Sequence, residues 1–161
     1  MIAFITRLFV RGEPVLSETS VRDAHDLAEL HAASFRRGWT DGEFTRLLIE
    51  PNVIAHRIAV GRKLCGFIMS RHTGDEAEIL SIAVAMAQRG RGLGRRLLDL
   101  HIRRLAGLGI QAVLLEVDED NAAARRLYAR AGFREIGRRA GYYQRPGSTA
   151  GHALVLRRDL A

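Results

Sequence analysis

The stretch QRGRGLGRRLL, which begins at Gln88, constrains the fold more than any other part of this chain. It follows the apolar run EILSIAV and opens an amphipathic helix, so Gly90, Gly92 and Gly94 fall in a turn between a strand and a helix. A glycine costs roughly 1 kcal/mol in helix-forming sequence, which indicates that a partner must approach this backbone closely. Exposed N–H groups at such a turn, together with the helix dipole, attract an anion.

The spacing of these glycines excludes the commonest nucleotide-binding loops. Arg95 follows Gly94 directly, so the pattern is not Gly-x-Gly-x-x-Gly, and no Gly-Lys-Ser/Thr ending makes it a P-loop. What remains is Arg-x-x-Gly-x-Gly, starting at Arg89, which lets a pyrophosphate meet the main chain while arginines offset its charge. The arginines available for this are Arg91, Arg95 and Arg96.

The patterns on either side of the turn predict an α/β (α+β) fold. Capping-box sequences at Ser20 and Thr40 each begin a helix, and short turns between the next apolar runs indicate an antiparallel meander. Asn121 and Gly132 bound a later helix. The expected strands lie near Val15 and at 54–60, 64–71, 77–84, 111–117, 134–140 and 152–157, with helices that follow residues 20, 40, 92 and 121.

Length and composition predict a single domain, 1–161, with 1–13 as a candidate N-terminal extension. The net charge is +7, but the arginines are spread along the chain rather than gathered in one run, so we expect that no nucleic acid is required. No apolar stretch approaches the roughly 20 residues of a membrane span, and we expect a cytoplasmic protein without a membrane partner. The histidines lack metal-ligand spacing, so no metal is expected. For the oligomeric state, we favour a monomer.

The turn and its flanks resemble the cofactor motif of the GCN5-related N-acetyltransferase (GNAT) superfamily, in which Arg/Gln-x-x-Gly-x-Gly/Ala wraps the pyrophosphate of coenzyme A. ILSIAV before the turn and RRLL after it carry the resemblance, although residues 85–87 lack the proline often found there. It implies a GNAT fold: a single mixed, mostly antiparallel sheet with splayed parallel central strands and helices on both faces. It also implies acetyl-CoA as cosubstrate. The residues it assigns to this cofactor are Ile82, Ala83, Val84, Arg89, Gly90, Arg91, Gly92, Leu93, Gly94 and Arg95.

A second segment, LEVDEDNAAARRLYARAGF, closely resembles the corresponding part of the RimI-type ribosomal-protein N-terminal alanine acetyltransferases. In that family a glutamate accepts a proton, an asparagine contacts coenzyme A and a tyrosine protonates the thiolate. The resemblance places these roles at Glu116, Asn121 and Tyr128. On spacing alone, Glu116 is rather a solvated carboxylate at a strand end, Tyr128 a core aromatic with its hydroxyl at the rim, and Asn121 a helix N-cap.

Tyr142 and Tyr143 lie in GYYQRPGSTAGHALVL, which is similar to that family's loop between the last two strands. That loop borders the acceptor peptide, so the resemblance implies that both rings flank a substrate backbone. An ordinary place on a strand is an equally good interpretation. His152 stands where an acidic residue is common in the family, which leaves the preferred acceptor sequence open.

The resemblance implies transfer of acetyl to the N-terminal α-amine of alanine in a protein, in particular a small-subunit ribosomal protein. An α-amine with a pKa of about 7.7–8.0 is roughly a tenth neutral at pH 7, whereas a lysine amine near 10.4 is almost wholly charged, so one carboxylate base suffices for the α-amine. Two alternatives stay open. One is an acetyltransferase of lysine side chains or of a small-molecule amine, and the other is a non-catalytic module that binds ribosomal RNA.

Overall fold

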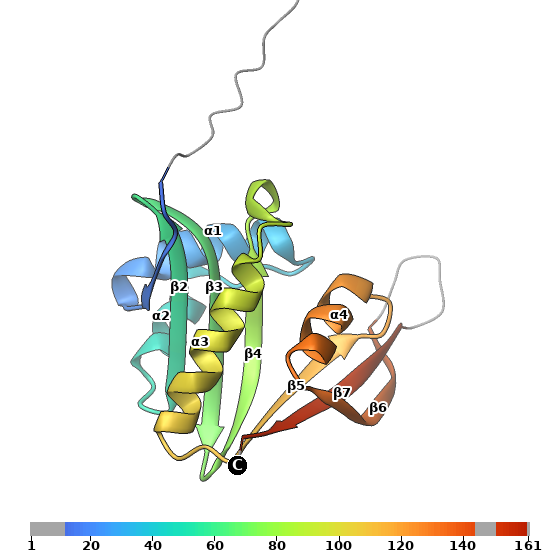
Figure 1. The fold of residues 1–161 in the computed structure, drawn as a ribbon. Coiled ribbons are helices and arrows are strands. Elements are labelled where there is room, and N and C mark those ends of the chain that lie inside the picture. The colour runs from blue at the N-terminus through green and yellow to red at the C-terminus, as the bar shows by residue number, and fades with distance from the viewer. Residues whose placement is uncertain (1–11, 144–150, 161) are drawn as a thin grey trace, which may run out of the picture.

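A computed structural model describes residues 12–143 and 151–160, with the backbone alone for residues 141–143. The described chain forms a seven-stranded sheet in the order β1-β2-β3-β4-β5-β7-β6 (Figure 1). The strands are β1 (Val15–Glu18), β2 (Val53–Val60), β3 (Lys63–Thr73), β4 (Glu76–Val84), β5 (Ala112–Asp118), β6 (Arg134–Tyr143) and β7 (Gly151–Asp159). The helices are α1 (Ala24–Ser34), α2 (Asp41–Ile49), α3 (Leu93–Gly107) and α4 (Ala122–Arg130), with short 3-10 turns η1 (Val21–Asp23) and η2 (Met86–Gln88).

Both predicted capping boxes are present. The Thr40 backbone N–H donates to Glu43 Oε2 at 2.7 Å, while Thr40 Oγ1 accepts from the Glu43 backbone N–H at 3.2 Å, and α2 starts at the next residue. The Ser20 box begins with the 3-10 turn η1, which leads directly into α1. These reciprocal bonds satisfy N–H groups that a helix start leaves without a partner, which explains why both helices begin where the sequence predicts.

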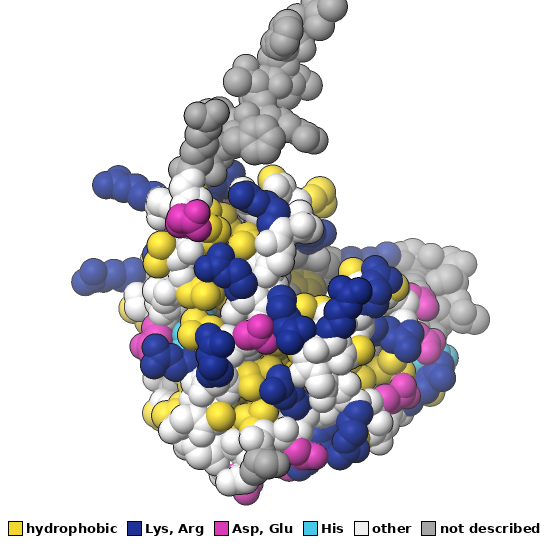
Figure 2. All heavy atoms as spheres, in the orientation of Figure 1, with side chains coloured by type: hydrophobic (Ala, Val, Ile, Leu, Met, Phe, Trp, Pro, Cys, Tyr) yellow, Lys and Arg dark blue, Asp and Glu magenta, His cyan; other side chains and the backbone are white. Residues whose placement is uncertain are grey.

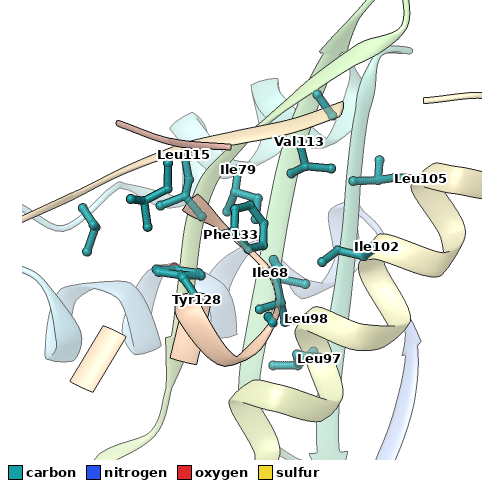
Figure 3. Close-up of a cluster of buried hydrophobic side chains, with 14 of the residues drawn as sticks. Ile68, Ile79, Leu97, Leu98, Ile102, Leu105, Val113, Leu115, Tyr128 and Phe133 are labelled. Carbon is teal, nitrogen blue, oxygen red and sulfur yellow. The ribbon is translucent and has the colours of Figure 1, made fainter. Parts of the chain in front are cut away.

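Helices cover both faces of the sheet, as the sequence predicts. On one face, α1 and α2 pack through Leu27 and Phe44 against Phe67 of β3. On the other face, α3 lies across β2, β3 and β4, and α4 lies over β5 and β7 (Figure 1). Leu97 of α3 and Tyr128 of α4 belong to the same buried cluster on this face (Figure 3).

The sheet opens between its two parallel strands. β4 and β5 pair over only three positions, from Glu76 with Ala112 to Glu78 with Leu114. Beyond them β4 stays with β3, and the pairing skips Leu80, while β5 continues along β7 as far as the pair of Asp118 with Ala153. The mixed, mostly antiparallel sheet with splayed central strands is therefore confirmed. Within residues 12–143 and 151–160, no helix has the length and apolar character needed to cross a membrane.

Candidate active site

The opening between β4 and β5 holds a cavity of about 600 Å³. Ile79–Ile82 of β4 and Leu115–Asp118 of β5 form its two sides. Residues from the end of α1 line it on one face of the sheet, and residues of α4 line it on the other. Glu116, Asn121 and Tyr128 all line it, so the fold brings these three candidate residues to one cavity.

The glycine turn lies at the N-terminus of α3, where the sequence predicts it. Gly90 and Gly92 have φ of +78° and +76°, in the left-handed region that side chains rarely adopt, and Gly92 is the N-cap of α3. A Cβ added at either position would meet nothing within 4 Å, so the main chain here is open to a ligand. A helix of 15 residues starts immediately after, and its N-terminal N–H groups and dipole suit a pyrophosphate. The turn therefore fits the group that the sequence assigns to it.

The arginines of this turn are already held by the chain itself. Arg89 Nε donates to the Val84 carbonyl at 3.0 Å, Arg91 Nη1 donates to Gln88 Oε1 at 2.6 Å, and Arg95 Nε donates to Asp99 Oδ1 at 2.9 Å. Arg89 thus ties the turn to the end of β4, and Gln88 is itself buried. The pre-formed part of the anion site is the backbone, with guanidinium groups at its margin.

Glu116 lies on the strand β5 with its carboxylate at the cavity. The burial of β5 alternates as the sequence predicts, since Leu115 and Val117 are buried on one face and Glu116 is on the other. The Glu116 side chain is 21% exposed, and its Oε1 lies 3.2 Å from Nε of Arg139 on β6. It is therefore a largely covered carboxylate with one cationic neighbour, rather than the solvated residue that spacing alone favours.

Tyr128 is both a core aromatic and a cavity residue. It is 5% exposed, and its ring meets the ring of Phe133 edge to face at a centroid distance of 5.6 Å. Figure 3 shows it in a cluster with Phe133, Leu115 and Ile79. Because it also lines the gap, the packed ring fixes the direction in which its hydroxyl points.

Asn121 caps α4 through its side chain, whose Oδ1 accepts from the Ala124 backbone N–H at 3.1 Å. This is the structural role expected from the sequence, and the residue also lines the cavity. Tyr142 and Tyr143 belong to β6, where Tyr143 pairs with Gly151, but their side chains lie outside the described residues. Their proposed contact with an acceptor stays a prediction.

The end of α1 also borders the cavity, through Ser34, Phe35 and Arg36, and sequence reasoning did not single these residues out. His31 anchors the loop that follows them. Its Nδ1 accepts from the Trp39 backbone N–H at 3.0 Å, and the His31 and Trp39 rings stack at 4.5 Å. Burial lowers the pKa of His31 to about 4, so the ring stays neutral and keeps this acceptor at neutral pH. The sequence feature that points to this loop is the pair His31 and Trp39, which flank it between two helices.

A sheet that parts between two parallel strands, beside a glycine turn that opens a long helix, defines an N-acetyltransferase. Among the described residues, no group of three His, Cys, Asp or Glu side chains is placed to hold a metal ion.

Residues 24–133 match the model of the Acetyltransferase (GNAT) family, and the chain belongs to this family. N-alpha-acetyltransferase RimI of Mycobacterium tuberculosis is 36% identical over 154 residues, which cover 91% of this chain and 94% of that protein. A mycothiol acetyltransferase of Mycobacteroides abscessus is 36% identical over 126 residues, and there the match spans 70% of this chain but 42% of the relative. The crystal structure of the ribosomal-protein-S18-alanine N-acetyltransferase from Escherichia coli superposes with a TM-score of 0.86 at 25% identity, covering 92% of this chain and 95% of that one.

Proposed function

We propose that this protein transfers acetyl from acetyl-CoA to the N-terminal α-amine of a cytoplasmic protein, with an alanine of a small-subunit ribosomal protein as the acceptor. The observation that carries the proposal is that Glu116 and Tyr128, which come from different elements, line one cavity beside the α3 turn. The relatives named RimI and ribosomal-protein-S18-alanine N-acetyltransferase match nearly the full length of this chain, which supports the same acceptor class. We treat residues 1–161 as one catalytic domain.

The donor would lie along the free edge of β4. The pyrophosphate would bind the backbone at Gly90–Gly94 and the start of α3 at Leu93, and Arg89, Arg91 and Arg95 would border it. The backbone of Ile82, Ala83 and Val84, beyond the last β4–β5 pair, would carry the pantetheine arm toward the gap. Asn121 would add a contact from the rim of α4.

The chemistry needs one base and one acid. The neutral amine nitrogen attacks the thioester carbonyl carbon, a C–N bond forms and the C–S bond breaks. Before this attack Glu116 takes a proton from the ammonium form of the acceptor, directly or through water. Tyr128 gives a proton to the departing thiolate, and the proton that the attacking nitrogen loses goes to solvent. The reaction then yields an amide and free coenzyme A, and solvent returns each side chain to its starting protonation state.

A second acceptor class has support of its own. The mycothiol acetyltransferase of Mycobacteroides abscessus is as similar in sequence as RimI of Mycobacterium tuberculosis, which favours a small-molecule amine as the alternative. The chain spans about two fifths of that relative's length, so the match concerns one part of a longer protein.

The deciding experiment measures release of free coenzyme A with three acceptors. The first is a peptide with a free N-terminal alanine and no lysine, the second a peptide with a blocked N-terminus and one internal lysine, and the third a small non-peptide amine. Turnover on the first alone supports the proposal. Turnover on the second or third alone keeps the enzyme class and overturns the acceptor.

A further inference from the structure

Nearly all of the net positive charge of this protein is carried by α3 and α4. These helices hold seven of its 25 Lys and Arg residues and one of its 18 Asp and Glu residues, which leaves 18 basic and 17 acidic residues for the rest of the chain. The seven arginines are Arg95, Arg96, Arg103, Arg104, Arg125, Arg126 and Arg130. The remainder of the molecule is therefore close to neutral, although it makes up most of the chain.

The fold gathers these arginines on one face. They form separate pairs and singles in the sequence, but α3 and α4 pack into the same buried cluster on the same side of the sheet. Figure 2 views the molecule from this side and shows Lys and Arg side chains gathered over it. All seven are exposed. We call this surface, defined by those seven arginines, the basic face.

Arg95 pairs with Asp99, and Arg96 and Arg125 donate to backbone carbonyls. The other four arginines of the basic face, namely Arg103, Arg104, Arg126 and Arg130, have neither an ion-pair nor a hydrogen-bond partner within the described part of the chain. The cofactor does not account for them. Arg103 lies ten residues beyond Leu93, which is about 15 Å along the axis of α3 from the glycine turn. Arg130 occupies the last turn of α4, far along that helix from the Asn121 cap. Like charges held together without counter-charges repel one another, so their clustering indicates an anionic partner.

The surface chemistry distinguishes among the anionic partners. A helix that lies on a membrane carries exposed apolar side chains beside its basic ones, but the apolar sides of α3 and α4 are buried against the sheet, and neither helix contains an exposed large hydrophobic residue. A protein interface normally has an exposed apolar or aromatic centre. The exposed large hydrophobic neighbour of Arg103 and Arg104 is Leu108, and Phe133, Leu154 and Leu156, which line the hollow next to Arg125 and Arg126, are buried. Exposed guanidinium groups suit a phosphate backbone, which they bind with paired hydrogen bonds.

We propose that Arg103, Arg104, Arg126 and Arg130 of the basic face bind RNA through its phosphate backbone, outside the cofactor site. The choice of RNA rests on the proposed function, because a ribosomal protein is met beside RNA. Such contacts position a protein without reading the base sequence. The face would thus hold the enzyme close to its acceptor without taking part in the acetyl transfer.

The test is fluorescence anisotropy with a labelled RNA stem-loop, titrated at salt concentrations from about 50 to 200 mM. The variant on the basic face combines Arg103→Gln, Arg104→Gln, Arg126→Gln and Arg130→Gln. The matched control combines Arg22→Gln, Arg46→Gln, Arg62→Gln and Lys63→Gln, which removes the same charge from exposed positions off this face. Circular dichroism establishes that both variants fold, and acetylation of the short alanine peptide without RNA reports the catalytic site independently.

We expect the wild-type protein to bind with an affinity that falls steeply with salt, and the basic-face variant to bind at least about tenfold more weakly. Its log–log salt slope should drop by about 0.7–0.9 for each phosphate that the variant no longer binds. The control should stay within about threefold of wild type, saturating acetyl-CoA should not displace the RNA, and both variants should acetylate the peptide. Equal weakening in both variants, displacement by acetyl-CoA, no RNA binding, or equal arginine-dependent binding of anionic lipid vesicles would overturn the proposal.

Discussion

Arg139 Nε lies 3.2 Å from Glu116 Oε1, so the edge strand β6 reaches across β7 to hold a carboxylate at the parting of the sheet. The Arg139 side chain is 59% exposed, and a pair this open contributes little to stability. It does fix the direction of the carboxylate. An amine that enters the gap therefore meets an oriented acceptor for its proton.

Substitution of Glu116 by Gln should lower kcat/KM on the alanine peptide by about a hundredfold at pH 7. The loss should shrink as pH rises above the α-amine pKa of about 7.7–8.0, because the acceptor then arrives neutral and needs no base. Initial rates of wild type and variant from pH 6.5 to 9.5 measure this. Glu119→Gln, which removes the carboxylate paired with Arg138, is the control and should stay near wild type. A loss of equal size at every pH would show that Glu116 positions the acceptor instead.

Tyr128→Phe keeps the ring that packs on Phe133 and removes only the hydroxyl. We expect turnover to fall by about a hundredfold or more while the Kd for acetyl-CoA stays within about twofold, since a proton donor acts on the leaving thiolate and not on binding. Calorimetric titration with acetyl-CoA and single-turnover assays separate the two effects. Normal turnover in this variant would remove Tyr128 from the mechanism.

Two glycines of the turn should respond in opposite ways to alanine. Gly92→Ala forces a side chain to φ of +76°, which costs about 1–2 kcal/mol of folding stability and moves the backbone that meets the pyrophosphate. At Gly94, inside α3, an added Cβ would make ordinary contacts at 3.7 Å with Leu127 and Val84, so Gly94→Ala should stabilise the helix by up to about 1 kcal/mol. Urea unfolding measures both changes.

The same pair of variants tests the cofactor site. Acetyl-CoA affinity should fall at least about tenfold in Gly92→Ala and stay within about threefold of wild type in Gly94→Ala. If both variants bind acetyl-CoA as wild type does, the turn does not hold the pyrophosphate.

A buried row of polar side chains should make the free energy of unfolding fall in acid. His56 Nδ1 lies 2.7 Å from His101 Nδ1, and His101 Nε2 lies 2.6 Å from Ser70 Oγ. Burial lowers the pKa of His101 to about 3 and also lowers that of His56, which faces Glu18 and Arg104. Both rings are neutral in the folded protein but take up protons near pH 6.5 when it unfolds. Their contribution to stability is thus complete above about pH 6.5 and is lost as pH falls toward 3.

The loss amounts to as much as about 1.4 kcal/mol per pH unit for each histidine that titrates. His101→Gln should flatten the fall of the unfolding free energy between pH 6.5 and 5, as measured in urea. His25→Gln is the control, because the bond to Asp41 raises the pKa of His25 and gives its contribution the opposite sign. A His101→Gln protein with the wild-type slope would contradict this account.

The sequence predicted the features that depend on residues close to one another along the chain. Capping boxes, the glycine turn and the alternation along β5 are local patterns, and each lies where it was expected. The contact of His56 with His101 joins residues 45 apart, and nothing near either histidine encodes it. The basic face was not predicted from the sequence for the same reason, because its arginines come together only when α3 and α4 pack on one side of the sheet.

The parting of β4 from β5 runs through the sheet, since the cavity is lined by the end of α1 on one face and by α4 on the other. A second hollow, next to Glu78 and Val155, also borders Glu116. Two reactants can thus occupy the slot together, each entering by its own side. The single cysteine, Cys65, is wholly buried and cannot relay an acyl group. With both reactants in the slot, the acetyl group would pass directly from thioester to amine within one ternary complex.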